Sequence, residues 1–533
     1  MSANMDVKRA LWQTFLEHAK PALDQWHAQL EQPQATQERL LQRLLETNRD
    51  CAFGRAHHFA RLQDSSQFRD NVPVHTYAQL QPWIERAQHE SAAILTTATP
   101  LFFERTSGNS ALQKAIPYTR AFLAEMHSAL TVWLADMHRQ VPGISHGSSY
   151  WSMSPPLQMP VAGPNGICLG SASDLEYLSG SHLAGLAGTL LIPEFNGALS
   201  QWRRQTLLAL LADADLSFIS VWSPTFLTSL LQPLFDAETP EQLQTFAWLE
   251  AALPAPRRSA LRRARAQGDC SELWPRLAAV SCWMEGPSRH YFTQLAARFP
   301  QAQWLPKSLF ATEGVVSVPF GDGPGCPLAI GSHYLEFLCE DGSLRHAHSL
   351  RLGETAQVLL STGGGLYRYA LGDRVRVVGM SGATPRVEFV GRATGTSDLV
   401  GEKLDEHVVQ NLFERCPTTQ AGACLIPNAY ASPPHYTALV AMSRDLDASA
   451  LALTIEAALS DAFHYGQARQ LGQLGPVQVR LLDGGADQLA QVLQQAAESS
   501  GIRAGDFKPR SLINRLETAE ALLALTESSC RHL

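Results

Sequence analysis

Residues 216–222 read Leu-Ser-Phe-Ile-Ser-Val-Trp, a run of apolar, aromatic and β-branched side chains that predicts a buried β-strand. Before it, residues 202–211 have the apolar spacing of an α-helix. After it, Ser223 and Pro224 are residue types favoured at the cap and the first position of a helix, which we expect to reach about Phe235. Helix, strand and helix in this order are typical of a layered α/β fold.

The chain changes character after about residue 329. Short strand-like runs at 357–362, 374–378 and 386–390 are separated by glycines, among them Gly363-Gly364-Gly365. A polar stretch follows at 393–398, and we place a domain boundary there.

Beyond this stretch, helical patterns at 448–463 and 489–498 flank a strand-like run at 477–482. The remaining length is enough for a compact small domain. We therefore predict an α/β protein with a large multi-sheet N-terminal domain, residues 1–392, and a smaller α+β C-terminal domain, residues 393–533.

The composition disfavours several classes of protein. The chain has 533 residues, is 45% hydrophobic and carries a net charge of −8, so we expect large cores and no nucleic-acid partner. We expect no secretory signal, because no apolar segment opens the chain, and no membrane span, because the most apolar run, 183–192, is too short. Nine scattered cysteines without a C-x-x-C pair favour a reduced, cytoplasmic protein. The oligomeric state cannot be read from the sequence.

Three short polar segments carry the chemistry, and the first is Thr106-Ser-Gly-Asn-Ser110. It follows an apolar run, 100–103, that predicts a strand, and Lys114 comes after it. Backbone N–H groups and hydroxyls in such a loop can surround phosphates. It is not a Walker loop, because Lys114 has no glycine before it and no serine or threonine after it. The alternative is a polar turn followed by an exposed lysine.

The second segment contains Thr312 and Glu313, and the third runs from Tyr367 to Asp373. A carboxylate at Glu313 can hold the Mg²⁺ that accompanies phosphates. Asp373 can accept hydrogen bonds from ribose hydroxyls. The alternatives are a surface glutamate at a strand end and an aspartate in a hairpin turn, which Gly372 would permit. Taken together, the three segments match the parts of an ATP site whose product is an enzyme-held adenylate.

Two other patterns are interpreted as chance matches. Residues 143–147, Gly-Ile-Ser-His-Gly, have the spacing of a serine-hydrolase elbow around Ser145, but the flanking sequence predicts neither the strand nor the helix that the elbow needs. His346 and His348 have no further histidine or cysteine nearby to complete a structural zinc site.

On these motifs the chain resembles the auxin-responsive acyl acid–amido synthetase family, in its bacterial branch, within the superfamily of adenylate-forming enzymes. The likeness covers nearly the whole chain. Its most specific part is Ser361-Thr-Gly-Gly-Gly-Leu-Tyr-Arg-Tyr369 with Leu371-Gly-Asp-Arg-Val375. The resemblance implies an adenylate-forming fold, the use of ATP and Mg²⁺, and a small domain that rotates about the segment near Arg392.

The resemblance also implies roles for individual residues. The positions that match the phosphate loop are Thr106, Ser107, Gly108 and Ser110. The other positions that match ATP-binding motifs are Thr312, Glu313, Tyr369, Asp373 and the hinge-side Arg392. The residues expected to act in catalysis are the metal ligand Glu313 and two lysines of the small domain, Lys403 and Lys508.

The implied reaction adenylates a carboxylic acid with ATP and passes the acyl group to an amine, an amino acid, to form an amide. One alternative is an acyl-CoA ligase with the same first step. Another is a non-catalytic adenylate-binding homologue, because Asn109 stands where threonine is usual and 111–112 replace a more glycine-rich tail. The sequence names neither the acid nor the amine. The residues that could line an apolar acyl pocket, or belong to the core, are Trp151, Trp222 and Trp283.

Overall fold

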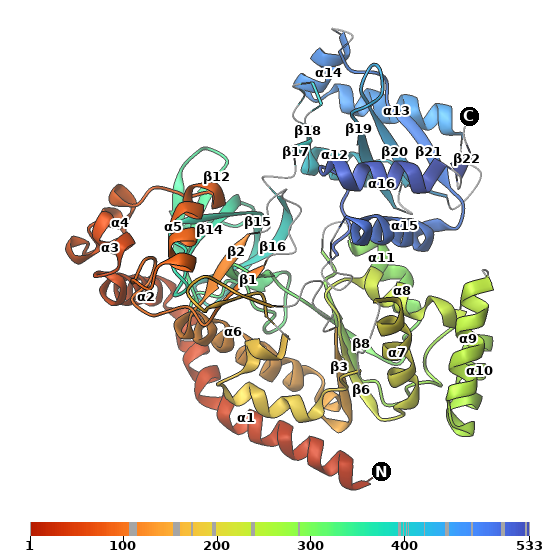
Figure 1. Cartoon of the computed structure of the whole chain (residues 1–533), viewed down its shortest axis with the longest axis horizontal. Helices are drawn as coiled ribbons and strands as arrows, with labels where there is room; N and C mark the ends of the chain where they lie inside the picture. The colour runs from red at the N-terminus through yellow and green to blue at the C-terminus, as the bar shows by residue number, and fades with distance from the viewer. Residues whose placement is uncertain are drawn as a thin grey trace.

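The structure is a computed structural model, shown in Figure 1. It describes residues 2–105, 114–152, 160–171, 174–193, 199–235, 240–285, 288–392, 396–397, 399–400, 402, 404–419, 422–442, 447–470, 473–500, 502, 507–527 and 530–531. The sheets of residues up to 392 and those after it are separate, and the C-terminal part lies above the rest of the molecule in Figure 1.

A four-stranded parallel sheet confirms the α/β pattern read around residue 216. Its order is β3 (Ser148–Trp151), β6 (Leu216–Ser220), β7 (Ala279–Cys282) and β8 (Gln303–Pro306). All five residues of β6 are buried, as expected for a strand covered on both faces. The helices of this region are α7 (Leu199–Ala212), α8 (Pro224–Phe235), α9 (Pro240–Ala252), α10 (Ala255–Gln267) and α11 (Ser288–Ala297).

The N-terminal helices surround the other sheets of the large part. The long helix α1 (Ser2–Glu31) buries Trp12, Phe15 and Trp26, which recur at helical spacing, and packs against α6 (Arg120–Gln140). The remaining helices here are α2 (Pro33–Asn48), α3 (Ala52–Ala56), α4 (Ser65–Asn71) and α5 (Tyr77–His89). A small sheet joins β2 (Ala115–Tyr118), β1 (Phe102–Arg105), β5 (Cys168–Leu169) and β4 (Val161–Ala162).

A six-stranded antiparallel sheet forms the centre of the large part. Its order is β11 (Cys326–Pro327), β16 (Thr384–Arg392), β15 (Tyr369–Ser381), β14 (Thr355–Ser361), β12 (Tyr334–Cys339) and β13 (Leu344–His346). The glycine turn between β14 and β15 needs a small residue, because Gly365 has φ of +96° and an added Cβ would lie 2.7 Å from the Leu95 Cβ.

The alternative that places Asp373 in a hairpin turn at Gly372 is wrong. Both lie inside β15, which is one continuous strand. Gly372 has φ of +89°, and the register with β16 shifts between Arg374 and Val375. Gly372 therefore permits an irregularity within β15. Such an irregularity changes the direction of nearby side chains, and the strand continues beyond it.

A buried ion-pair network anchors the beginning of β15. The Arg368 Nε donates to Glu336 Oε2 at 2.9 Å, and the Arg69 Nε donates to Glu336 Oε1 at 2.8 Å. The Arg368 side chain also donates to the carbonyls of Arg69 and Val72. Arg368 is 2% exposed and Glu336 is 1% exposed. The network ties β12 and β15 to α4 and to Val72, which directly follows it.

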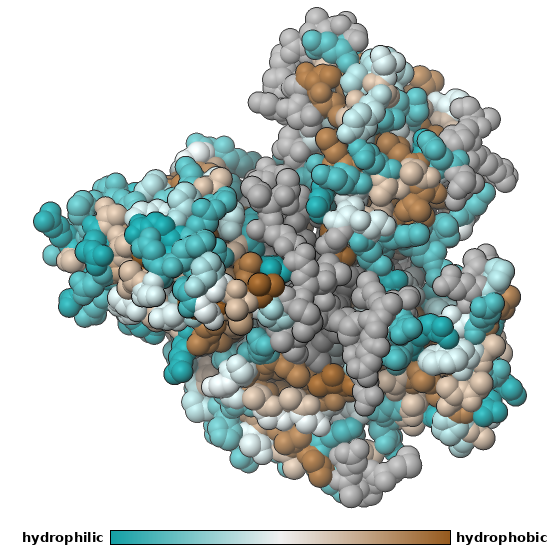
Figure 2. Space-filling view, in the orientation of Figure 1, coloured by the Kyte–Doolittle hydropathy of each residue, from teal (hydrophilic) through white to brown (hydrophobic). Residues whose placement is uncertain are grey.

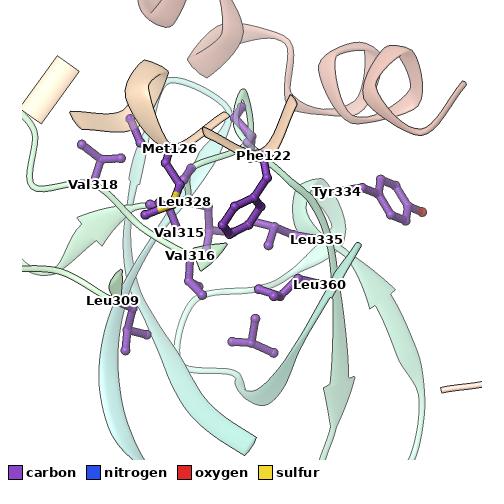
Figure 3. Close-up of a cluster of buried hydrophobic side chains, with 14 of the residues drawn as sticks. Phe122, Met126, Leu309, Val315, Val316, Val318, Leu328, Tyr334, Leu335 and Leu360 are labelled. Atoms are coloured by element: carbon purple, nitrogen blue, oxygen red, sulfur yellow. The ribbon is translucent and has the colours of Figure 1, made fainter. Parts of the chain in front are cut away.

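A two-stranded hairpin, β9 (Phe310–Ala311) and β10 (Gly314–Val315), holds Thr312 and Glu313 in its turn. Figure 3 shows the apolar cluster that supports it, in which Phe122 and Met126 of α6 lie close to Val315 and Val316. Gly314 has φ of +153°, and an added Cβ would lie 2.9 Å from His333 Nε2. Apolar packing therefore holds the hairpin in place, and position 314 requires glycine because a side chain there would clash with His333.

The C-terminal part is a sheet between two helical layers. Its strands are β19 (Ala423–Asn428), β20 (His435–Ala441), β21 (Gln478–Leu482) and β22 (Cys530–Arg531). Leu425 joins one core, whereas its neighbours Cys424 and Ile426 join the other, as the alternation of a strand requires. The other elements are β17 (Thr396–Ser397), β18 (Leu404–Asp405), α12 (Glu406–Arg415), α13 (Ala448–Ser460), α14 (Phe463–Gln470), α15 (Gly485–Ser499) and α16 (Leu516–Glu527).

The face of the molecule in Figure 2 mixes hydrophilic and hydrophobic residues. Within the described ranges, no helix combines the length and the apolar character that crossing a bilayer needs.

We expect Glu336→Ala to lower the free energy of unfolding by about 3–5 kcal/mol, because it leaves the buried Arg368 guanidinium without its carboxylate. Denaturant unfolding of the two proteins measures the difference. The matched control is Glu340→Ala, since Glu340 pairs with Arg374 from an exposed position and should contribute less than about 1 kcal/mol. Equal losses in the two variants would show that the buried network does not anchor β15.

Candidate active site

A cavity of about 390 Å³ lies where the large part meets the C-terminal part. Residues of the parallel sheet, the β9–β10 hairpin and β15 line it from one side, and residues 507–515 line it from the other. The site residues predicted from sequence that line this cavity are Thr312, Glu313, Asp373 and Lys508. Their chemical roles remain predictions, but the structure brings these three distant segments to one place.

Glu313 is the centre of a polar cluster in the cavity. The Lys114 Nζ donates to Glu313 Oε1 at 3.3 Å and to Tyr369 Oη at 2.8 Å, and the Tyr369 hydroxyl donates to the same carboxylate oxygen at 3.3 Å. The Lys114 ammonium also lies 5.8 Å from the centroid of the Tyr77 ring. Burial raises the pKa of the Tyr77 hydroxyl, so this ring stays neutral beside the ammonium.

The backbone around Glu313 is held independently of this cluster. The Tyr118 hydroxyl donates to the carbonyl of Thr312 at 2.9 Å. His333, whose ring lies against Gly314, contacts Glu125 Oε2 at 2.8 Å through Nδ1. The strand β2 and the helix α6 therefore both fix the turn that presents Thr312 and Glu313.

Asp373 reaches the cavity from within β15 and is 3% exposed. Its register partner on β16 is Arg392, the last residue of that strand. The predicted ribose-binding residue and the predicted hinge-side residue are thus adjacent in one sheet.

The predicted phosphate loop lies outside the described residues, with Thr106, Ser107, Gly108 and Ser110. Its two flanks are described, and both Arg105 and Lys114 line the cavity. The strands β1 and β2 on either side of it pair antiparallel, so the last residue of β1, Arg105, lies opposite the first residue of β2, Ala115. Lys403 also lies outside the described residues, and its role stays a prediction.

Lys508 comes from the C-terminal part. Its Nζ lies 4.9 Å from the centroid of the Trp283 ring, which belongs to the large part. The chain that carries it runs beside β19, where Leu425 N donates to Ser511 O and Ile513 N donates to Leu425 O. Nearby, Ser511 N donates to Glu406 Oε1 at 3.2 Å. The position of Lys508 is therefore set by backbone pairing within the C-terminal part.

Aromatic side chains form the apolar wall of the cavity. The tryptophans that line it are Trp133, Trp151, Trp222 and Trp283. For Trp151, Trp222 and Trp283, which the sequence alone places either in a pocket or in the core, the position on the cavity favours the pocket. Trp222 continues from β6 and its carbonyl accepts from Trp283 N, so the parallel sheet positions this wall.

Sequence reasoning missed several charged residues of the cavity, and two of them, Glu104 and Lys307, are almost fully buried. Glu104 on β1 is 2% exposed, and its Oε2 receives no hydrogen bond from the residues that the structure describes. Lys307, directly after β8, is 3% exposed and donates to Ser220 Oγ at 2.8 Å. Burial lowers the pKa of Lys307 to about 7, with Cys282 acting in the opposite direction. A lysine is read as exposed by default, so no sequence signal marked Lys307.

The elbow pattern at Ser145 does not form a hydrolase site. Ser145 lies in the short 3₁₀ helix η2 (Pro142–His146), before β3, and its hydroxyl donates to the carbonyl of Pro142 at 2.9 Å. The strand, sharp turn and helix that such a nucleophile needs are missing here. Among the described residues no group of histidine, cysteine and carboxylate side chains has the arrangement of a metal site.

Comparison with protein families settles where the chain belongs. The model of the GH3 family N-terminal domain matches residues 22–304, that of the central domain matches 326–392, and that of the C-terminal domain matches 407–517. The chain belongs to the GH3 family. The resemblance read from the three motifs is therefore confirmed.

Individual proteins agree with this GH3 assignment. The chain is 25% identical over 465 residues to a protein of Oryza sativa subsp. japonica named probable indole-3-acetic acid-amido synthetase GH3.12, covering 72% of this chain and 73% of the other. The structure of this chain is similar to that of AtGH3.15 acyl acid amido synthetase in complex with 2,4-DB, with a TM-score of 0.78, 16% identity and 96% of both chains covered.

A more distant likeness is to 2-hydroxyisobutyryl-CoA ligase in the postadenylation state, in complex with R3-HIB-AMP. The TM-score is 0.52, with 13% identity and 94% of both chains covered. The predicted fold, a large α/β part with a smaller C-terminal part as in adenylate-forming enzymes, is confirmed.

We expect Lys307→Met to stabilise the folded chain at pH 7 by up to about 4 kcal/mol, because methionine fills similar space without a buried charge. The pKa of Lys307 is lower in the folded chain, about 7, than its ordinary value of 10.5. The cost of the ammonium is therefore complete below pH 7 and disappears as the pH rises toward 10.5. Denaturant unfolding at pH 7 and pH 10 measures it, and a difference independent of pH would contradict the expectation.

Proposed function

We propose that this chain is an ATP-dependent ligase that adenylates a carboxylic acid and transfers the acyl group to an amine, an amino acid, to form an amide. The observation that carries the proposal is the convergence of Glu313, Asp373 and Lys508 on one cavity that also has an aromatic wall. Membership of the GH3 family supports it, since the family's named relatives include amido synthetases.

The polar end of the cavity suits a nucleotide. Asp373 would accept hydrogen bonds from the ribose hydroxyls, and the segment 106–110 would surround the phosphates with N–H groups and hydroxyls. Lys114, Thr312 and Tyr369 border the same region. The lysine ammonium would stabilise the negative charge that builds up at the α-phosphate, and such preorganised electrostatics is usually the largest contribution to catalysis.

The carboxylate of Glu313 fits a magnesium ion. Its Oε1 is engaged by Lys114 and Tyr369, whereas Oε2 receives no hydrogen bond from the described part of the chain. Mg²⁺ is commonly held by one or two carboxylates together with substrate phosphates. Bound there, the ion would neutralise phosphate charge.

The apolar end of the cavity suits the acid. Tryptophan rings would hold its hydrocarbon body and exclude water, which protects an acyl-adenylate from hydrolysis. In the first step a carboxylate oxygen bonds to the α-phosphorus and pyrophosphate leaves. In the second step the amine nitrogen bonds to the acyl carbon, AMP leaves and the amine loses a proton.

We further propose that residues 393–533 form a domain that closes over this cavity, with Arg392 next to the hinge. Lys508 would act in the adenylation step, because it lies on the cavity wall beside Trp283. Lys403 would reach the adenylate in a second orientation of the domain. Such closure is a common way to exclude water and complete a catalytic site.

The function is tested by measuring pyrophosphate release from ATP with a panel of carboxylic acids. An active acid is then incubated with ATP and either CoA or an amino-acid mixture, and the product is identified by mass spectrometry. We expect an amide with an amino acid. A thioester with CoA would replace the proposal by the acyl-CoA ligase, and no acid-dependent release with any acid would favour a non-catalytic adenylate-binding protein.

We expect Lys508→Ala to slow acid-dependent pyrophosphate release by about 10²–10³-fold, the usual effect of removing one group that stabilises transition-state charge. Stopped-flow detection of pyrophosphate measures the rate. The matched control is Lys20→Ala, which removes an exposed lysine of α1 and should leave the rate unchanged. An unchanged rate in Lys508→Ala removes Lys508 from the adenylation step.

We expect Asp373→Ala to weaken ATP binding by roughly 10–100-fold, because hydrogen bonds to a charged group contribute about 1.5–3 kcal/mol. Calorimetric titration with ATP measures this, with circular dichroism to show that β15 is intact. Asp341→Ala, at an exposed aspartate outside the cavity, is the control. ATP affinity that survives Asp373→Ala contradicts the ribose assignment.

A further inference from the structure

Lys307 is a buried cation on the wall of the same cavity. Its ammonium donates to Ser220 Oγ at 2.8 Å and lies 4.7 Å from the Trp133 ring centroid and 4.5 Å from the Trp222 ring centroid. Two aromatic faces and one hydroxyl therefore surround a charge that has left water. The ammonium has three donors, and Ser220 accepts one of them.

In the described part of the chain, no carboxylate balances this charge. Among the residues that the structure describes, none with a carboxylate, Glu104 included, forms an ion pair with Lys307. Burying an ammonium without a partner is costly, and lysine is rarely buried unless it is paired. Burial lowers the pKa of Lys307 to about 7, because desolvation disfavours the charged ammonium.

Among the described residues, Lys307 forms no hydrogen bond or ion pair with Glu313 or Tyr369 at the phosphate end of the cavity. Lys114 already pairs with Glu313 and Tyr369 there, and Lys508 adds another cation beside Trp283. Lys307 instead sits among the tryptophans that suit the body of the acid. The cavity thus has a cation at its apolar wall that an ordinary monocarboxylic acid would leave unpaired.

We infer that Lys307 binds a second carboxylate of the acid substrate, so that the preferred acids are dicarboxylates with an apolar or aromatic body. The inference rests on the proposed function, in which the first carboxylate is adenylated near Glu313. The ammonium donates one hydrogen bond to Ser220 and faces two tryptophan rings, and the second carboxylate would accept a further hydrogen bond from it. Lys307 is in this sense a specificity-determining residue, which acts by binding and does not take part in the bond changes.

The test compares matched acids on the intact chain. Isophthalate and terephthalate are titrated against benzoate without ATP, with tryptophan fluorescence and calorimetry as the readouts, because two tryptophans contact the ammonium. We expect at least one diacid to bind at least 30-fold more tightly than benzoate. Lys307→Met should remove this preference and change benzoate affinity less than 3-fold. The control is Lys20→Met, an exposed lysine of α1, which should keep the preference.

The pH dependence gives a second readout. Cys282 of β7 is the titratable group beside Lys307, and burial raises its pKa to about 12, so it stays neutral. The neighbours on α6 and β6, Trp133 and Ser220, carry no charge. Since the free ammonium loses its proton above about pH 7, diacid affinity should fall by up to about tenfold per pH unit above that value. Lys307→Met should show no such fall.

The outcomes separate the inference from the proposed function. If the diacids bind no better than benzoate, or if Lys307→Met weakens diacid and benzoate equally, the inference is overturned even when pyrophosphate release proceeds. Equal weakening would mean that Lys307 holds the reacting carboxylate. If diacid binding depends on Lys307 but no acid supports pyrophosphate release, the binding assignment stands and the proposed ligase reaction fails.

Discussion

The site depends on one buried carboxylate, that of Glu336, which holds the guanidinium groups of Arg368 and Arg69 together. This network fixes the first residues of β15 against the C-terminal end of α4. Tyr369 follows Arg368 directly, and its hydroxyl reaches Glu313 in the β9–β10 turn. The buried ion pair of Glu336 with Arg368 is thus linked to the polar cluster of the cavity, because Tyr369 is the next residue in the chain after Arg368. Breaking such a pair leaves a buried charge uncompensated, so it specifies geometry strongly whatever its net contribution to stability.

The cavity divides its charges between two ends. At the polar end, Lys114, Glu313 and Tyr369 hydrogen-bond to one another, so a nucleotide would find these groups already positioned. At the apolar end, Lys307 forms no ion pair with any carboxylate of the described residues. A protein keeps such an expensive group where a ligand can offset its cost. Lys114 is paired with Glu313 at the polar end, whereas Lys307 is not paired with a described carboxylate at the apolar end. This difference in charge balance is the physical basis for placing substrate selectivity at Lys307.

Local patterns in the sequence were enough to find the α/β layering, because residues 202–235 carry strong periodicity and capping signals that tertiary packing did not overrule. Asp373 was found as a candidate, but the sequence did not distinguish a strand from a hairpin turn at this position. A positive φ at Gly372 suits a strand irregularity as well as a turn, and only the pairing with β16 separates the two. The contact between Lys114 and Glu313 spans 199 residues and leaves no local trace. Lys307 was missed because its burial is decided by α6, β6 and β7 together.

The relation between the two parts of the chain follows from where apolar burial occurs. The described hydrophobic cores of the C-terminal part contain only residues after 392, and those of the large part contain only residues before it. The contacts that join the two parts include the packing of α15 against α8 and an ion pair between Arg203 of α7 and Glu498 of α15. Partly exposed pairs of this kind contribute about 1 kcal/mol or less. Because no described core spans residue 392, the two parts can change their relative orientation without unfolding either, which a two-step reaction that uses first Lys508 and then another lysine would require.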